Sequence, residues 1–236
     1  EVDLRFVPMA CQRCHVTVFP QLAAPGQALA VQPSKAVARR LCHRWSFNGT
    51  LADSVTGRTA DRARFISLGP DVLPKDAATV EIWFTRNSYR RHAKLFAAGC
   101  SLDDSLLVSL DGVDETVGMS VNLGRKTVLS LGRVEDGKPY HLALAVSAPN
   151  GAGRSRLTGT LTDAATGRRI ATAVYRTEEP WSLADLTQKT VALGWGSWWG
   201  NLDADLTVDE CRVWQGTLSE DEIAASVKAG PDGECR

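Results

Sequence analysis

Short segments in which apolar and polar side chains alternate recur about every ten residues along most of the chain. Residues 79–84 show the pattern clearly. Successive side chains of a strand point to opposite faces of a sheet, so such a segment can bury one face and expose the other. Asp111-Gly112 and Asp136-Gly137 stand between segments and favour turns. The sequence therefore predicts an all-β, two-sheet antiparallel sandwich.

The predicted strands share this alternation and are bounded by turn-forming residues. They cover residues 41–47, 64–68, 79–84, 94–99, 105–110, 117–121, 127–131, 140–146, 156–161, 170–175, 190–194 and 207–214. The segment 140–146 is the longest apolar run, so we expect it to be central in its sheet. Asn150-Gly151 then predicts a hairpin that leads into the next strand.

A short helix is predicted near the end of the chain. Ser219 and Glu222 have the spacing of a capping box, and the acidic residues between them favour the positive end of a helix. Gly230-Pro231 predicts where this helix ends.

Length and charge limit the classes of protein to which the chain can belong. Its 236 residues suffice for one large sandwich, which we assign to residues 41–236, preceded by an arm at residues 1–40. Lysine plus arginine and aspartate plus glutamate number 27 each, so no net field favours nucleic acid. No run of 18 apolar residues predicts a membrane span, and residues 1–5 do not resemble a signal peptide. If the protein is exported, we expect that its signal has been removed.

Several stretches, taken in order, resemble the landmarks of a LamG-like, concanavalin A-like jellyroll domain. They are residues 43–49 leading to Asp53, then 78–83, 139–144, 208–214 and 218–223. The resemblance covers approximately residues 41–232. It implies a jellyroll sandwich whose first and last strands lie side by side. It also implies a secreted or cell-surface protein.

The arm carries the sequence Cys11-Gln-Arg-Cys14-His15. Two cysteines at this spacing, followed by histidine, are typical of covalent c-type haem attachment, with the histidine as an iron ligand. This motif resembles that of c-type cytochromes, although the rest of the arm does not. A second axial ligand would come from a histidine such as His43, or from a neighbouring chain.

Two other interpretations of the arm remain open. Cys11, Cys14 and Cys42 with His15 or His43 have the ligand types of a tetrahedral zinc site. The six cysteines could instead form disulfides, as their even number suits an oxidising compartment. The arm itself would then dock on its own sandwich, or on a neighbouring subunit by strand addition, which would give a homo-oligomer.

The segment 194–200 contains Trp195, Trp198 and Trp199 among three glycines. Indole rings stack on sugar faces and offer a polar N–H group, so an exposed loop of this composition predicts glycan contact. The alternative is that these rings fill the edge of the sandwich, because large aromatic side chains usually end mostly buried.

The family resemblance also implies a structural Ca²⁺ ion near the paired end strands. Asn48, Asp53 and Asp209 stand where related jellyrolls hold calcium, and their oxygen atoms are suitable ligands. An ordinary turn carboxylate is the alternative role for Asp53.

Enzymatic activity is not predicted. Glycoside hydrolysis needs two carboxylates, and residues 81–86 do not reproduce the Glu-x-Asp-x-x-Glu arrangement of related jellyroll glucanases. We therefore expect a non-catalytic extracellular protein used for binding, adhesion or assembly, including assembly as a filament subunit. A glycan-binding module and a haem-bearing electron-transfer subunit are the alternative hypotheses. Expected partners are glycans or other subunits of an extracellular assembly.

Overall fold

The computed structural model describes residues 39–62, 65–99, 103–111, 119–195 and 203–233. Internal contacts divide the chain into two units, Glu1–Pro33 and Ser34–Arg236, and all described residues belong to the second unit. Cys11, Cys14 and His15 lie outside the described residues, and the haem, zinc and docking predictions for the arm stay predictions. None of the helices in the described ranges is long and apolar enough to cross a membrane.

The regular structure of the described chain is mostly β-strand, and the strands form two antiparallel sheets, which confirms the predicted fold class. The strands are β1 (Arg40–Trp45), β2 (Asp61–Arg62), β3 (Ile66–Gly69), β4 (Ala78–Ser88), β5 (Lys94–Gly99), β6 (Ser105–Ser109), β7 (Met119–Leu123), β8 (Lys126–Gly132), β9 (Pro139–Val146), β10 (Arg156–Asp163), β11 (Arg169–Arg176), β12 (Val191–Leu193) and β13 (Asp205–Gln215). A 3₁₀-helix, η1 (Leu183–Asp185), and a helix, α1 (Glu220–Ala229), complete the fold.

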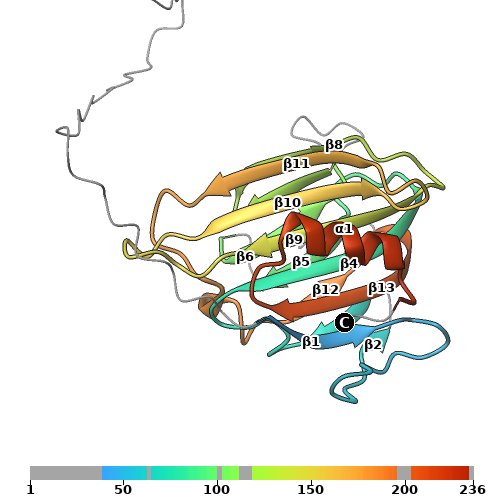
Figure 1. Ribbon diagram of the computed structural model, residues 1–236, viewed down its shortest axis with the longest axis horizontal. Helices are drawn as coiled ribbons and strands as arrows, with labels where there is room; N and C mark the ends of the chain where they lie inside the picture. The colour runs from blue at the N-terminus through green and yellow to red at the C-terminus, as the bar shows by residue number, and fades with distance from the viewer. Residues whose placement is uncertain (1–38, 63–64, 100–102, 112–118, 196–202, 234–236) are drawn as a thin grey trace, which may run out of the picture. The chain divides into compact units, whose positions relative to one another are not determined.

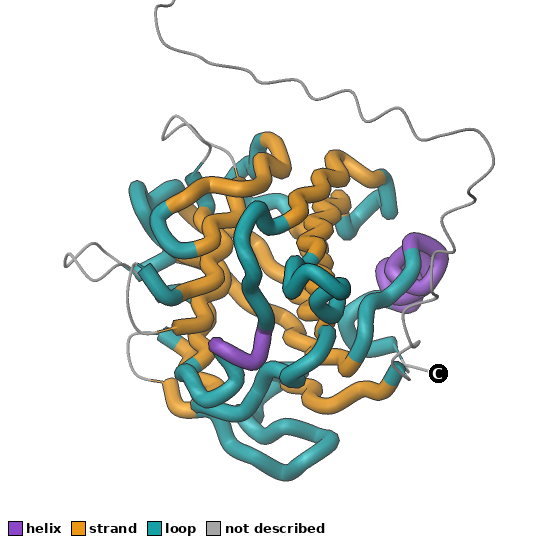
Figure 2. Tube along the Cα trace, turned by 90° about the vertical axis from the view of Figure 1, so that its left-hand side faces the viewer, coloured by secondary structure: helices purple, strands orange, loops and turns teal. Residues whose placement is uncertain are grey.

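The six-stranded sheet has the order β1-β13-β4-β9-β10-β11, and the seven-stranded sheet has the order β2-β3-β12-β5-β6-β7-β8. Figure 1 looks onto the six-stranded sheet, with α1 lying across its outer face. Figure 2 shows the two layers from the side. The predicted neighbours β1 and β13 pair antiparallel, and β9 lies inside its sheet, as its apolar sequence indicates.

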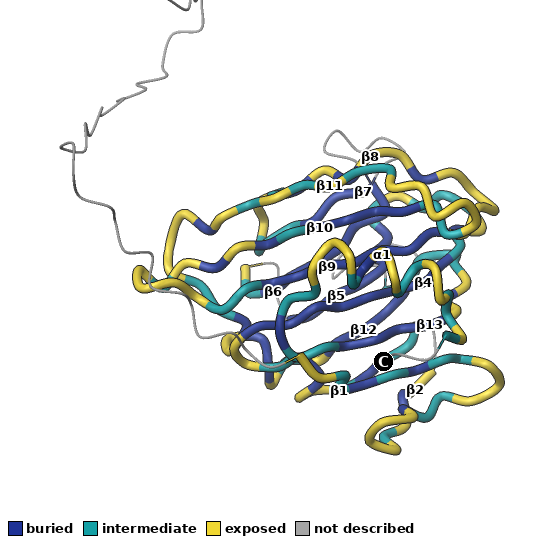
Figure 3. Tube along the Cα trace, in the orientation of Figure 1, coloured by how far each residue is buried: buried dark blue, intermediate teal, exposed yellow. Residues whose placement is uncertain are grey.

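The core lies between the two sheets and follows the alternation seen in the sequence. In β4, Val80, Ile82 and Phe84 point into the core, whereas Glu81 and Trp83 point to the opposite face. Figure 3 shows the resulting buried strands at the centre of the sheet and the more exposed β11 at its edge. Each large apolar side chain buried in this way contributes about 1.5–3 kcal/mol to the free energy of unfolding.

Helix α1 covers polar residues on the outer face of the six-stranded sheet. The predicted capping box is present, since Ser219 and Glu222 exchange hydrogen bonds, and Gly230 forms the C-cap. Beneath the helix, His141 Nε2 lies 3.0 Å from Glu81 Oε1, and both side chains are fully buried. The histidine thus has the structural role that its strand motif indicates.

The sequence did not indicate every element. Strand β2 and η1 were not predicted. Of the cysteines in the described ranges, Cys42 and Cys211 are both free thiols. Cys211 packs in the core, where burial strongly raises the pKa of its thiol. Cys11, Cys14, Cys100 and Cys235 lie outside the described residues, so disulfide bonding stays a prediction.

Candidate functional site

The outer face of the seven-stranded sheet carries a row of polar side chains that the strand register aligns. Lys94 of β5 is opposite Ser109 of β6, which is opposite Ser120 of β7, which is opposite Ser130 of β8. Figure 2 shows α1 against the other sheet, so no helix of the described chain covers this face. Lys94, Ser109 and Ser120 of this row are nevertheless buried, and Ser130 is exposed.

Asn122 joins the hydroxyl groups of this face into a network. Its side-chain oxygen accepts a hydrogen bond of 3.1 Å from Ser109 Oγ and one of 3.4 Å from Ser120 Oγ. Its amide nitrogen donates to Thr127 Oγ1 at 2.7 Å. These bonds fix the side chains, so the face offers preordered donors and acceptors rather than mobile ones.

At one end of the row, three polar residues lie around the carboxylate of Asp111. We call Tyr89, His92, Lys94 and Asp111 the Asp111 cluster. The backbone N–H of His92 donates to Asp111 Oδ2, and Tyr89 also hydrogen-bonds to this carboxylate. Lys94 Nζ donates to His92 O at 2.8 Å. The cluster comes from the β4–β5 connection and the end of β6, which the sheet brings together.

Burial shifts the pKa values of two side chains in the Asp111 cluster, Lys94 and Tyr89. Lys94 is 9% exposed, and burial lowers its pKa, although the charge of Asp111 partly opposes this shift. Burial and the nearby charge of Asp111 raise the pKa of Tyr89. His92 has a backbone φ of 62°, in the left-handed region that side chains other than glycine rarely adopt. Perturbed pKa values and backbone strain are both concentrated at functional sites in proteins.

One oxygen of the cluster lacks a partner. Asp111 is 5% exposed, and its Oδ1 accepts no hydrogen bond from the described part of the chain. Ser105 Oγ, at the opposite end of β6, is buried and unpaired in the same way within those residues. Leaving a buried acceptor unpaired costs about 1–3 kcal/mol, and folded proteins rarely accept this cost without a ligand or water as partner.

Trp195 stands beside the cluster. Its backbone oxygen accepts the N–H of Lys94 at 2.7 Å, and its ring centroid lies 6.1 Å from that of Phe65. Phe65 also lines a cleft of about 400 Å³, together with Phe47 and Arg62. This volume lies in the range of small-ligand sites. Trp195 is half-buried, and Trp198 and Trp199 lie outside the described residues, so glycan contact by these rings stays a prediction.

The residues predicted to bind calcium separate into two groups. The carboxylate of Asp53 is buried and accepts hydrogen bonds from Arg44 N at 2.8 Å, from Val55 N at 2.9 Å and from the Thr56 hydroxyl. Its Oδ2 also lies 2.6 Å from His43 Nδ1. These hydrogen bonds show that Asp53 fixes the conformation of its own loop.

Asn48 and Asp209 instead lie near a third residue. Asn48 Nδ2 donates to Asp232 Oδ1 at 2.7 Å, and the charge of Asp232 adds to burial in raising the pKa of Asp209. Within the described ranges, no three His, Cys, Asp or Glu side chains form a group that could hold a metal ion. Calcium binding by Asn48, Asp53 and Asp209 stays a prediction.

His43, the predicted second haem ligand, is accounted for inside the domain. It is 9% exposed, it contacts Asp53 through Nδ1, and its ring stacks on Trp45 with centroids 5.2 Å apart. This environment explains the residue without a haem. The neighbouring Cys42 is half-buried at a bulge between Leu41 and His43, where β1 pairs with β13.

The sequence indicated Trp195 as a candidate but did not indicate the Asp111 cluster. Asp111 was predicted only as a turn residue. One sequence signal could have indicated the cluster. Lys94 and Asp111 are charged residues that stand next to strongly apolar strand segments. Two strands that are neighbours in the sheet bring these charges together, and the sequence alone did not indicate this pairing.

Two stacked antiparallel sheets, with paired end strands and a polar, aromatic-flanked outer face, define a lectin-like jellyroll. The family profile Laminin_G_3, described as the concanavalin A-like lectin/glucanases superfamily, matches residues 58–224. The chain belongs to this family. The family assignment confirms the resemblance that the sequence landmarks indicated. A comparison with curated protein sequences gives no match.

Solved structures show the same fold. Domain 4 of AbnA, a GH43 extracellular arabinanase from Geobacillus stearothermophilus in complex with arabinotriose, has a TM-score of 0.57 and 17% identity, covering 79% of this chain and 98% of that one. Tailspike protein 2 of Escherichia coli O157:H7 bacteriophage CAB120 has a TM-score of 0.52 and 17% identity. That match covers 80% of this chain and 26% of the tailspike. At such identity the likeness concerns the fold alone.

Proposed function

We propose that this protein is a glycan-binding module whose site is the Asp111 cluster together with Trp195. The unpaired, buried Asp111 Oδ1 is the observation that supports this proposal most directly. Sugar hydroxyl groups are hydrogen-bond donors, and a hydrogen bond to an ionised carboxylate is about twice as strong as one between neutral groups. A bound sugar would therefore supply the missing partner.

The surroundings of Asp111 also suit a saccharide. The Trp195 and Phe65 rings give apolar surface for the C–H face of a sugar ring. Domain 4 of AbnA, which shares the fold, is described in complex with arabinotriose. The family description names both lectins and glucanases, so the prediction of a non-catalytic protein stays a prediction.

Substitution Asp111→Asn tests the proposal. The amide keeps an oxygen for the His92 N–H but loses the charge, so we expect glycan affinity to fall about tenfold or more. The measurement is binding of the purified chain to a panel of immobilised neutral and acidic oligosaccharides that includes arabinotriose. Calorimetry with the best binder then gives the dissociation constants of the wild type and the variant.

The matched control is Asp103→Asn. Asp103 lies on the surface and pairs with Arg125, so the variant removes the same charge away from the cluster. We expect its glycan affinity to equal that of the wild type. Two results would count against the proposal: no binding to any member of the panel, or equal loss of affinity in both variants.

A further inference from the structure

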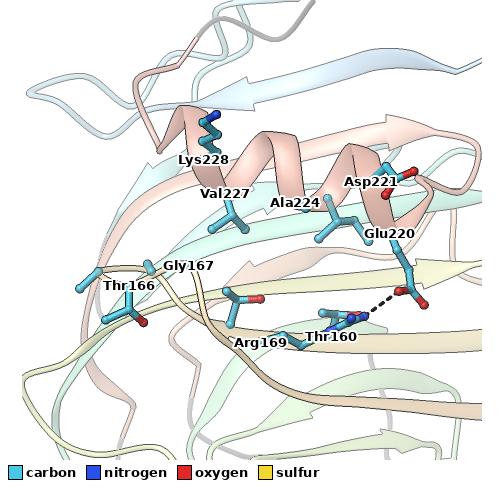
Figure 4. Close-up of a pocket in the computed structure, with 13 residues that line it drawn as sticks. Thr160, Thr166, Gly167, Arg169, Glu220, Asp221, Ala224, Val227 and Lys228 are labelled. Carbon is cyan, nitrogen blue, oxygen red and sulfur yellow. Dashed lines mark hydrogen bonds and ion pairs between the residues drawn. The ribbon is translucent and has the colours of Figure 1, made fainter.

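A groove of about 510 Å³ separates α1 from the hairpin formed by β10 and β11. Figure 4 shows that Ala224 and Val227 of the helix form one wall, while Thr160 of β10 lies on the opposite side. Because the groove is on the outer face of the six-stranded sheet, it is a separate surface from the Asp111 cluster.

The two ends of this groove carry opposite charges. Figure 4 shows Glu220 and Asp221 at one end and Lys228 at the other. Arg169 Nη1 lies 2.7 Å from Glu220 Oε2, which neutralises that glutamate. Asp221 and Lys228 take part in no ion pair with any described residue, so they leave a negative end and a positive end.

The distance between these charges follows from helix geometry. Asp221 and Lys228 are seven positions apart in α1, and a helix rises 1.5 Å per residue, so their backbones are separated by about 10 Å. An extended chain rises about 3.3 Å per residue, so three residue steps cover the same distance. The apolar wall between the ends can accept small apolar side chains, and the threonine hydroxyl groups can bond to peptide groups.

We propose that this groove binds an extended peptide segment with a basic side chain at the Asp221 end and an acidic side chain three residues away, at the Lys228 end. A single ion would satisfy only one end of the groove. An extended peptide can pair with the charges at both ends. Its side chains point alternately to opposite sides, so some can contact the apolar wall of α1 while others face the threonine hydroxyl groups. The proposal is independent of the glycan site, which lies on the other sheet.

The test uses the full chain and three fluorescent tetrapeptides with blocked termini. Their sequences are Lys-Ala-Val-Glu, Lys-Ala-Val-Lys and Glu-Ala-Val-Glu, and binding is followed by fluorescence anisotropy. The wild type is expected to bind the mixed peptide about fivefold more tightly than either of the others, as an exposed ion pair contributes up to about 1 kcal/mol. In Lys228→Glu, both ends become negative, so the dilysine peptide is expected to bind best.

Two variants separate the groove from general charge effects. Lys228→Gln and Ala225→Glu each make the net charge more negative by one, but Ala225 lines a different hollow on the other side of α1. We expect only Lys228→Gln to weaken binding of the mixed peptide. Ala224→Trp fills the groove and is expected to abolish binding of all three peptides while circular dichroism stays unchanged.

Three results overturn the proposal. The first is that the wild type binds none of the peptides at millimolar concentration. The second is that it binds all three equally. The third is that Ala225→Glu weakens the mixed peptide as much as Lys228→Gln does.

Discussion

At the scale of single residues, Asp53 and Asp209 were given the same predicted role and have opposite electrostatic surroundings. Burial alone would raise the pKa of Asp53, but hydrogen bonds from Arg44 N and the Thr56 hydroxyl hold it below its usual value. For Asp209, burial and the charge of Asp232 act in the same direction and raise the pKa. Asp53 thus stabilises the fold as a carboxylate, whereas ionised Asp209 opposes it.

Substitution Asp209→Asn should therefore stabilise the protein at neutral pH. A carboxyl group whose pKa is raised by folding stabilises the folded state below its unfolded pKa, and this contribution is lost as pH rises through the folded pKa. We expect the variant to gain a few tenths of a kcal/mol at neutral pH, because Asp209 is largely exposed. The gain should vanish at about pH 3, where the Asp209 carboxyl group is protonated in both the folded and the unfolded chain.

The measurement is the melting temperature of the wild type and of Asp209→Asn at several pH values, with and without calcium chloride. If Asp209 takes part in calcium binding, calcium should raise the melting temperature of the wild type and should not raise that of Asp209→Asn. A variant that is less stable than the wild type at neutral pH in the absence of calcium would contradict the assigned repulsion.

At the scale of elements, Arg212 attaches α1 to the sheet. It lies over the ring of Trp83 at 4.5 Å, and its guanidinium group donates to Ser226 Oγ at 3.1 Å and to Pro231 O at 2.7 Å. It also pairs with the buried carboxylate of Glu210. One side chain therefore connects β13 to the helix through Ser226 and to the turn that follows the helix through Pro231.

We expect Arg212→Met to destabilise the protein by about 3 kcal/mol, because it leaves the charge of Glu210 with fewer partners in a buried place. Amide hydrogen exchange should show the largest loss of protection in α1. The double variant Glu210→Gln/Arg212→Met removes the stranded charge, so it should be more stable than the single variant. Equal stability of the two variants would show that the buried charge is not the source of the cost.

At the scale of the whole molecule, the two sheets approach closely where β10 faces β8. A Cβ atom added to Gly159 would lie 3.0 Å from both terminal methyl groups of Leu131 and 3.3 Å from a methyl group of Leu129. Gly159 is therefore required by the space between the sheets. In an isolated strand a glycine at this position would be destabilising, because glycine loses more backbone entropy on folding than other residues do.

Substitution Gly159→Val tests this packing. Three added carbon atoms would force the sheets or the leucine side chains apart, and we expect a loss of about 1–3 kcal/mol in the free energy of unfolding. Urea denaturation gives this value. Thr158→Val, at the neighbouring position on the other face of β10, should be nearly neutral. If both variants lose the same stability, close contact between the sheets is not the cause.

The sequence alone determined the local and patterned features of this protein. Alternation placed Val80 and Ile82 in the core, and the capping box at Ser219 set the start of α1, because these signals depend on residues close in sequence. The ordered landmarks also identified the family. For the candidate site, the sequence supplied Trp195, but only as one of three tryptophans with the same prediction.

The tertiary structure decided which polar residues meet. Lys94 and Asp111 are 17 positions apart and come together only because β5 and β6 pair in the seven-stranded sheet. Asp53 and Asp209 were grouped from sequence, but hydrogen bonds to loop backbone separate their roles. Strand order and burial cannot be read from residue types, because each polar side chain can be paired, unpaired or repelled depending on its neighbours in space.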